Sequence, residues 1–77
     1  MADSWPIWMT SEQADRLRKE LGAAGFQAAF FESFDCGHEL GVAVELGERR
    51  HAVRVQRPEG LASVVFLMKQ WRDRTNG

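Results

Sequence analysis

The chain has 77 residues and a mass of 8.8 kDa, which is the size of one small domain and leaves no room for a separate cofactor-binding domain. Apolar residues make up 44% of the chain and charged residues 27%, which excludes a disordered or fibrous protein. The net charge of −1 argues against a protein that binds nucleic acid or an anionic membrane through general electrostatic attraction.

The two halves of the chain carry opposite charges. Residues 1–48 have a net charge of −6, and residues 49–77 have a net charge of +5. Opposite charges on neighbouring strands stabilise a sheet, so we expect the two halves to neutralise each other within one fold.

Cysteine content and hydropathy bear on the compartment. Cys36 is the only cysteine, which excludes an internal disulfide and is typical of the reducing cytosol. The N-terminus lacks the basic and apolar regions of a signal peptide, and the longest apolar run, Val64 to Met68, is far too short to span a membrane. We therefore predict a cytoplasmic protein that makes no contact with a membrane.

An apolar arm, residues 1–9, precedes a single predicted domain, residues 10–77. Pro6 disfavours helix at the residue before it, so we expect the arm to be extended. Thr10 and Gln13 stand at the spacing of a capping box, which predicts that a helix begins at this point. Gly22 or Gly25 supplies the left-handed residue that ends this helix. Its apolar stripe consists of Ala14, Leu17, Leu21 and Ala24.

Three strands are predicted next, from their content of aromatic residues and their alternation of apolar and polar residues. They span Phe26 to Asp35, His38 to Leu46 and Arg49 to Arg57. A two-residue, glycine-first turn between the second and third strands suits a tight hairpin. It sets Val42 opposite Val53 on one face and Glu45 opposite Arg50 on the other, so a buried pair and a charged pair agree on one register.

A second helix is predicted from Pro58, because proline suits the first turn of a helix. Its stripe consists of Leu61, Val64, Val65, Met68, Trp71 and Arg72, and Phe66 falls on the opposite side. The element order is therefore α-β-β-β-α. We predict an α+β fold in which the two helices cover one face of a three-stranded antiparallel sheet.

The first strand has aromatic residues on both faces, although the helices can cover only one. A two-residue turn after this strand pairs Phe31 with Val42 and leaves Phe30 and Phe34 on the open face. A three-residue turn would bury Phe30 and Phe34 but would place Glu32 in the core, where an unpaired carboxylate costs several kcal/mol. We therefore predict the first register.

The open face of the sheet is the predicted binding surface for a protein partner. Its centre is aromatic and flat because Gly41, Ala43 and Ala52 have almost no side chains, and apolar patches with a charged rim are typical of interfaces. The predicted partner-binding residues are Phe30, Glu32, Phe34, Glu39, Glu45, Arg50 and Arg54. Two other occupants of this face stay open, namely the arm around Trp5 and Trp8, folding over as a lid, and a second copy of the chain.

The arginines of the third strand have two interpretations. Arginines on a sheet face can grip phosphates or carboxylates. The interpretation we favour is a solvated strand matched to Glu39 and Glu45 on its neighbour, because these acidic residues would repel phosphate. Direct binding of nucleic acid therefore ranks below binding of a protein.

Asp35, Cys36 and His38 lie together at the first turn, and His51 joins them if it pairs with Val44. Cysteine and histidine at this spacing form zinc sites or thiolate–imidazole pairs in other proteins, but zinc requires four ligands and a structural site usually brings more cysteines. No glycine-rich phosphate loop follows a strand. We predict no catalytic residue, no metal and no cofactor, and hence a protein that is not an enzyme.

The element order and one stretch of sequence resemble the double-stranded-RNA-binding domain family. This stretch is Gly37-His38 followed by Val42, Val44, Leu46 and Gly47, at the spacing of that family's second strand. The family has a lysine cluster at the start of its second helix, over the RNA phosphates, where this chain has Pro58 to Ser63 without lysine. The resemblance implies the fold, and it implies duplex RNA binding as an alternative function.

In size and character the chain resembles small phage-encoded inhibitors of host defence, notably anti-CRISPR proteins. The resemblance covers no motif, because that group shares none. It implies stoichiometric binding to a subunit of a CRISPR effector complex in the host cytoplasm and a block of target-DNA binding. The stretch Glu20 to Glu48, which contains no lysine or arginine, would then occupy a basic channel. A small subunit or homodimer of a larger assembly is the remaining alternative.

Overall fold

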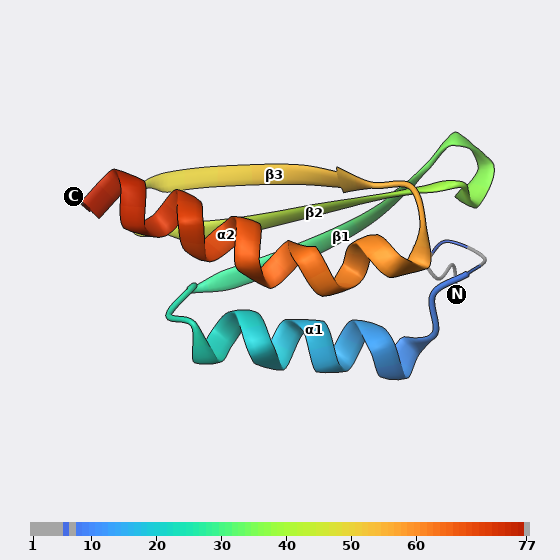
Figure 1. The fold of residues 1–77 in the computed structure, drawn as a ribbon, viewed down its shortest axis with the longest axis horizontal. Coiled ribbons are helices and arrows are strands. Elements are labelled where there is room, and N and C mark those ends of the chain that lie inside the picture. Colours follow the sequence, from blue (N-terminus) through green and yellow to red (C-terminus); the bar gives the residue numbers. More distant parts are fainter. Residues whose placement is uncertain (1–5, 7, 77) are drawn as a thin grey trace.

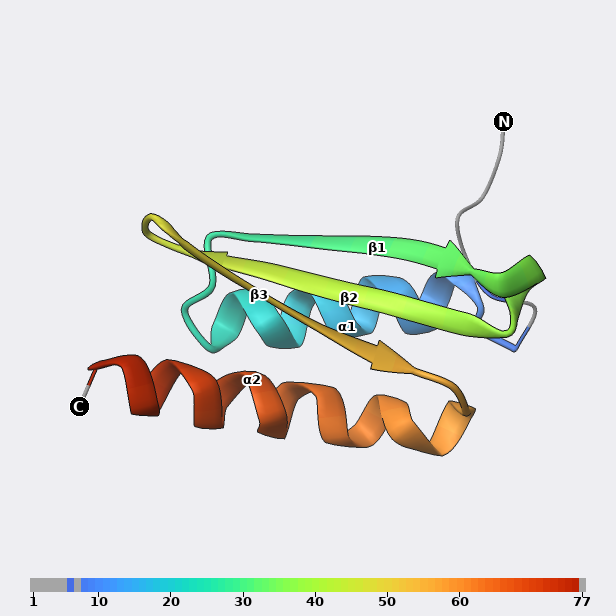
Figure 2. The same ribbon diagram turned by 90° about the horizontal axis from the view of Figure 1, so that it is seen from above.

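The computed structural model describes residue 6 and residues 8–76 and confirms the α+β fold with the order α-β-β-β-α. The elements are α1 (Ser11–Ala23), β1 (Ala28–Phe34), β2 (Glu39–Leu46), β3 (Arg49–Val55) and α2 (Leu61–Asn76), with 3₁₀ turns at Asp35–Gly37 and Pro58–Gly60. The strands form one antiparallel sheet in the order β1-β2-β3. Both helices lie against the same face of this sheet and run in the same direction (Figure 1), and α2 lies beside β3 (Figure 2).

Local signals determine both ends of α1. The Thr10 Oγ1 atom accepts a hydrogen bond from the Gln13 backbone N–H, and the Gln13 side chain accepts one from the Thr10 N–H, which confirms the capping box. At the other end Gly25 has a φ of 101°, and the N–H of Phe26 donates to the carbonyl of Leu21. This Schellman-type ending directs Phe26 into the core. It explains why β1 begins at Ala28, two residues later than predicted.

The predicted register of the sheet is confirmed. Phe31 lies opposite Val42, and Val42 lies opposite Val53. In the first turn the His38 N–H donates a hydrogen bond of 3.1 Å to the Asp35 carbonyl, and the two residues between them, Cys36 and Gly37, have positive φ. Asp35 also has a positive φ, of 52°, so β1 ends one residue earlier than predicted.

The core lies between the sheet and the two helices. Its fully buried side chains include Leu21 of α1, Val64 and Met68 of α2, and three residues of the central strand β2. Those three are Leu40, Val42 and Val44. The predicted stripe of α2 is confirmed, and Phe66 points away from the core with 61% of its surface exposed.

Trp71 joins the C-terminal part of α2 to the sheet and to the end of α1. Its ring stacks on His51 of β3 at 4.9 Å between centroids and on Phe26 at 6.2 Å. The neighbouring Arg72 donates a hydrogen bond from Nη1 to the carbonyl of Ala24, at the C-terminal end of α1. A cation at this end of a helix is favoured by the helix dipole.

Candidate functional site

The open face is the side of the sheet opposite the helices. Alternation along β1 directs Phe30, Glu32 and Phe34 to this face, while Phe31 packs against the core on the other side. Phe30 is 47% exposed and Phe34 is half-buried. The structure therefore leaves aromatic side chains on the face that carries no helix in the described part of the chain.

A hollow of about 340 Å³ lies in the middle of the open face. Its lining includes Phe30, Glu32, Phe34 and Arg54, together with Gly41, Ala43, Ala52 and Val53. Phe30 lies in register with Ala43 and Ala52, so one complete row across the three strands has only one large side chain. The hollow exists because two of the three residues in that row are alanines.

Arg50 contacts two residues of the same face. Its Nη2 atom lies 2.8 Å from the Glu45 carboxylate, and its guanidinium carbon lies 5.3 Å from the centroid of the Phe30 ring. The predicted pairing of Glu45 with Arg50 is therefore confirmed. Both contacts are exposed, so each contributes about 0–1 kcal/mol to stability.

Arg54, which lines the hollow, repeats this arrangement. Its Nη1 atom lies 3.4 Å from the Glu39 carboxylate, and its guanidinium carbon lies 4.8 Å from the centroid of the Phe34 ring. The other carboxylate oxygen of Glu39 accepts a hydrogen bond from the Gln56 side chain at 2.8 Å. Arg50 and Arg54 of the open face thus each contact one glutamate and one phenylalanine.

Glu32 is the exception on this face. It lies opposite Gly41, which in turn lies opposite Arg54, so Glu32 and Arg54 are separated by the width of the central strand. Within residues 6 and 8–76, the Glu32 carboxylate forms no hydrogen bond or ion pair. Glu32 is exposed, so the charge in the hollow that has no charged partner within the described residues is negative.

All seven predicted partner-binding residues lie together on one face. The cation–π contacts of Arg50 and Arg54 were not predicted, although the register already places these arginines on the same face as the two phenylalanines.

A second feature that was missed is a groove between β3 and α2. Its signal in the sequence was Leu67, an apolar residue outside the stripe of α2.

The predicted lid falls partly outside the described residues, since these include neither Trp5 nor Ile7. Pro6 is fully buried, and Trp8 packs against the core and donates from Nε1 to the His38 carbonyl at 3.2 Å. None of the residues that line the hollow belongs to this described part of the arm.

The predicted proximity of His51 to the first turn is wrong. Val44 does pair with His51, but this pair lies five residues along β2 from Glu39, about 16 Å from the turn at the usual rise of a strand. The His51 ring also points to the helix side, where it stacks on Trp71. Across the described ranges, no three histidine, cysteine, aspartate or glutamate side chains converge as metal ligands.

Comparisons of the chain with protein families, with curated proteins and with solved structures gave no match. Neither of the two described helices has the length and apolar character needed to cross a bilayer.

Proposed function

We propose that this chain is a non-enzymatic protein-binding module that docks its open face onto a basic protein surface. The unpaired carboxylate of Glu32 in an aromatic hollow carries this proposal. Arg50 and Arg54 of the open face already interact with glutamates of the same chain, so they are not the charges that await a partner. An arginine or lysine from a partner would form an ion pair with Glu32 and lie against a phenylalanine ring.

The remaining features of the face support docking of a protein. Aromatic side chains at the centre of a patch and charged side chains around it are typical of protein interfaces. The resemblance to phage-encoded inhibitors gives the proposal a specific form. In that form the partner surface is the basic nucleic-acid channel of a CRISPR effector subunit, and occupation of the channel blocks target DNA.

A short basic probe tests the chemistry of the face. Capped Gly-Arg-Gly tripeptide is titrated into ¹⁵N-labelled protein, and we expect amide shifts centred on Phe30, Glu32 and Phe34. Glu32→Gln keeps the size of the side chain and should remove these shifts, whereas Glu20→Gln, at an exposed position on α1, should not. Shifts that spread evenly over all exposed carboxylates would contradict the proposal.

The partner itself is tested with variants that spare the fold. Phe30→Asp and Glu32→Lys should abolish its capture from native cytosol while changing the midpoint of thermal unfolding little, because both side chains are exposed. If either variant unfolds, the face is part of the core and the proposal fails. A fixed dimer mass in light scattering, independent of concentration, would instead favour the homodimer.

A further inference from the structure

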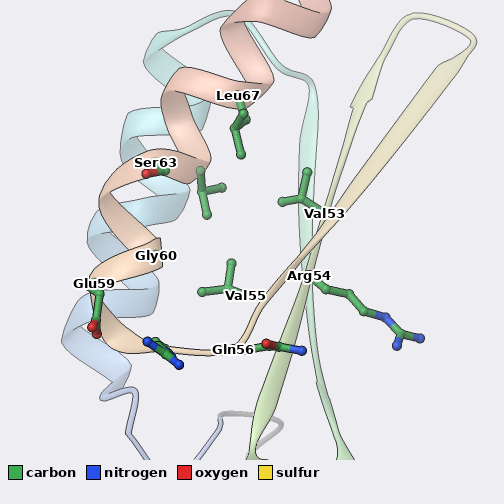
Figure 3. Close-up of a pocket in the computed structure, with 10 residues that line it drawn as sticks. Val53, Arg54, Val55, Gln56, Glu59, Gly60, Ser63 and Leu67 are labelled. Carbon is green, nitrogen blue, oxygen red and sulfur yellow. The ribbon is translucent and has the colours of Figure 1, made fainter.

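A groove of about 400 Å³ runs between the edge strand β3 and helix α2. Val53 and Val55 point into it from β3, and Leu67 points into it from α2 (Figure 3). Arg54 extends to the other side of the strand, toward the open face (Figure 3). The groove therefore lies on the helix side of β3, and the hollow around Glu32 lies on the opposite side.

The backbone of β3 is open along this groove. β3 pairs with β2 alone, and its outward N–H and C=O groups have no other backbone partner in the described part of the chain. α2 leaves the groove open rather than closing it, since Leu67 remains 42% exposed. An uncovered edge strand beside an apolar groove is the geometry used for recognition of peptides by strand addition.

The charges around the groove favour an acidic ligand. Arg50, Arg54 and Arg72 have carboxylate partners within the chain. Arg57, which lines the groove, and Arg49 form no ion pair within the described residues, whereas Lys69 lies away from the groove, in a hollow with Glu20 and Ala24. The groove itself is lined by one acid without an ion pair in the described part of the chain, Glu59, next to its end at Arg57. Arg49 begins β3 and Arg57 follows its end, so an unpaired cation stands at each end of the edge.

We propose that the groove between β3 and α2 binds an extended acidic segment of a partner protein, which adds to the sheet as a fourth strand. Alternate side chains of an added strand point to the same face, so its apolar residues would meet Val53 and Leu67 in the groove. Carboxylates near its ends would meet Arg49 and Arg57. The groove shares Val53 and Arg54 with the lining of the hollow but lies on the other face of β3, and this proposal does not depend on the function proposed for the open face.

The probe is the capped heptapeptide Glu-Thr-Val-Thr-Val-Thr-Glu, whose valines and glutamates share one face of an extended strand. Titrated into ¹⁵N-labelled protein, it should shift the amides of β3 and of the first half of α2. Leu67→Asp should weaken binding about tenfold or more, because it places a carboxylate in the groove. Phe66→Asp is the matched control, since Phe66 is the adjacent residue, is more exposed and lies outside the groove. It should leave the affinity unchanged.

Two altered peptides test the mode of binding. A version N-methylated at every valine and threonine lacks the N–H groups needed for pairing with β3 in either strand direction and should lose binding, and a version with lysine at each end should bind more weakly. Equal binding of either version, or shifts that map to β1, would overturn the proposal, as would the absence of shifts at millimolar peptide. Glu32→Gln should leave the affinity for the heptapeptide unchanged. The experiment can therefore contradict binding at the groove without contradicting the function proposed for the open face, and the reverse.

Discussion

The Phe34 ring lies over Gly41 of the neighbouring strand, so closely that any β-carbon at position 41 would collide with the ring atom Cε2. Glycine is therefore favoured at this position by the ring above it rather than by a left-handed backbone. The same ring carries the Arg54 guanidinium 4.8 Å from its centroid. The position of Arg54, and with it one wall of the hollow, depends on the missing side chain of Gly41.

Gly41→Ala should displace the Phe34 ring and weaken partner binding at the open face. Alanine gains about 0.4–1 kcal/mol through the unfolded chain, but the displaced ring costs about 0.5–1.5 kcal/mol in rotamer strain and loses its contact with Arg54. We expect a net loss of stability below about 1 kcal/mol, measured by urea unfolding. Gly22→Ala in α1 is the control, because nothing lies within 4 Å of its added β-carbon, and it should stabilise the protein. Equal effects of the two substitutions would argue against the ring contact.

A double-mutant cycle measures the contact between Arg54 and Phe34. Arg54→Met combined with Phe34→Leu should give a coupling free energy of about 0.5–1 kcal/mol, the usual range for an exposed cation–π pair. Arg57→Met combined with Phe34→Leu is the matched control, since Arg57 makes no contact with this ring within the described residues. Its coupling should be near zero, and a coupling as large as that of Arg54 would show a general charge effect.

Two adjacent residues of α2 test which side of the helix forms the core. Met68 is fully buried and Leu67 is 42% exposed. Met68→Ala should lower the free energy of unfolding by about 2–5 kcal/mol, which is a large share of the stability of a domain this small. Leu67→Ala should cost less than about 1 kcal/mol. Comparable losses at the two positions in denaturant titrations would mean that α2 packs in a different rotation.

The alternative function, binding of duplex RNA, makes a separate prediction. The face arginines are held by glutamates of the chain, and the second helix begins without lysine. We expect no change in fluorescence anisotropy when the protein is added to a labelled RNA duplex of about 16 base pairs at low salt, where phosphate contacts are strongest. Binding that weakens steeply with added salt would support the RNA-binding alternative over the protein-binding proposal.

Arg72 links the two helices, and its removal should destabilise the protein. A hydrogen bond from a charged donor contributes about 1.5–3 kcal/mol, and this one satisfies a carbonyl at the C-terminal end of α1. Arg72→Met keeps most of the apolar stem and should cost about 1–2 kcal/mol in thermal or urea unfolding. Arg74→Met removes a nearby exposed arginine and should cost less than about 0.5 kcal/mol. Equal costs would indicate that the hydrogen bond contributes little.

Local patterns in the sequence determined the element order, the register and the two faces of the sheet. The capping box at Thr10, the two-residue turns and the alternation along β2 each act over a few residues, so they can be interpreted without knowing the fold. The exposure of Glu32 was also predicted correctly, because burial of a lone carboxylate is costly in any fold.

Only the tertiary structure decided which charges of the open face are already satisfied. Whether Arg54 reaches Glu39 and the Phe34 ring depends on side-chain rotamers and strand twist, which no local pattern specifies. The stacking of the His51 ring on the Trp71 ring and the shape of the groove beside Leu67 likewise depend on how α2 packs against β3. Packing across elements joins residues far apart in the chain, so its outcome depends on the whole fold.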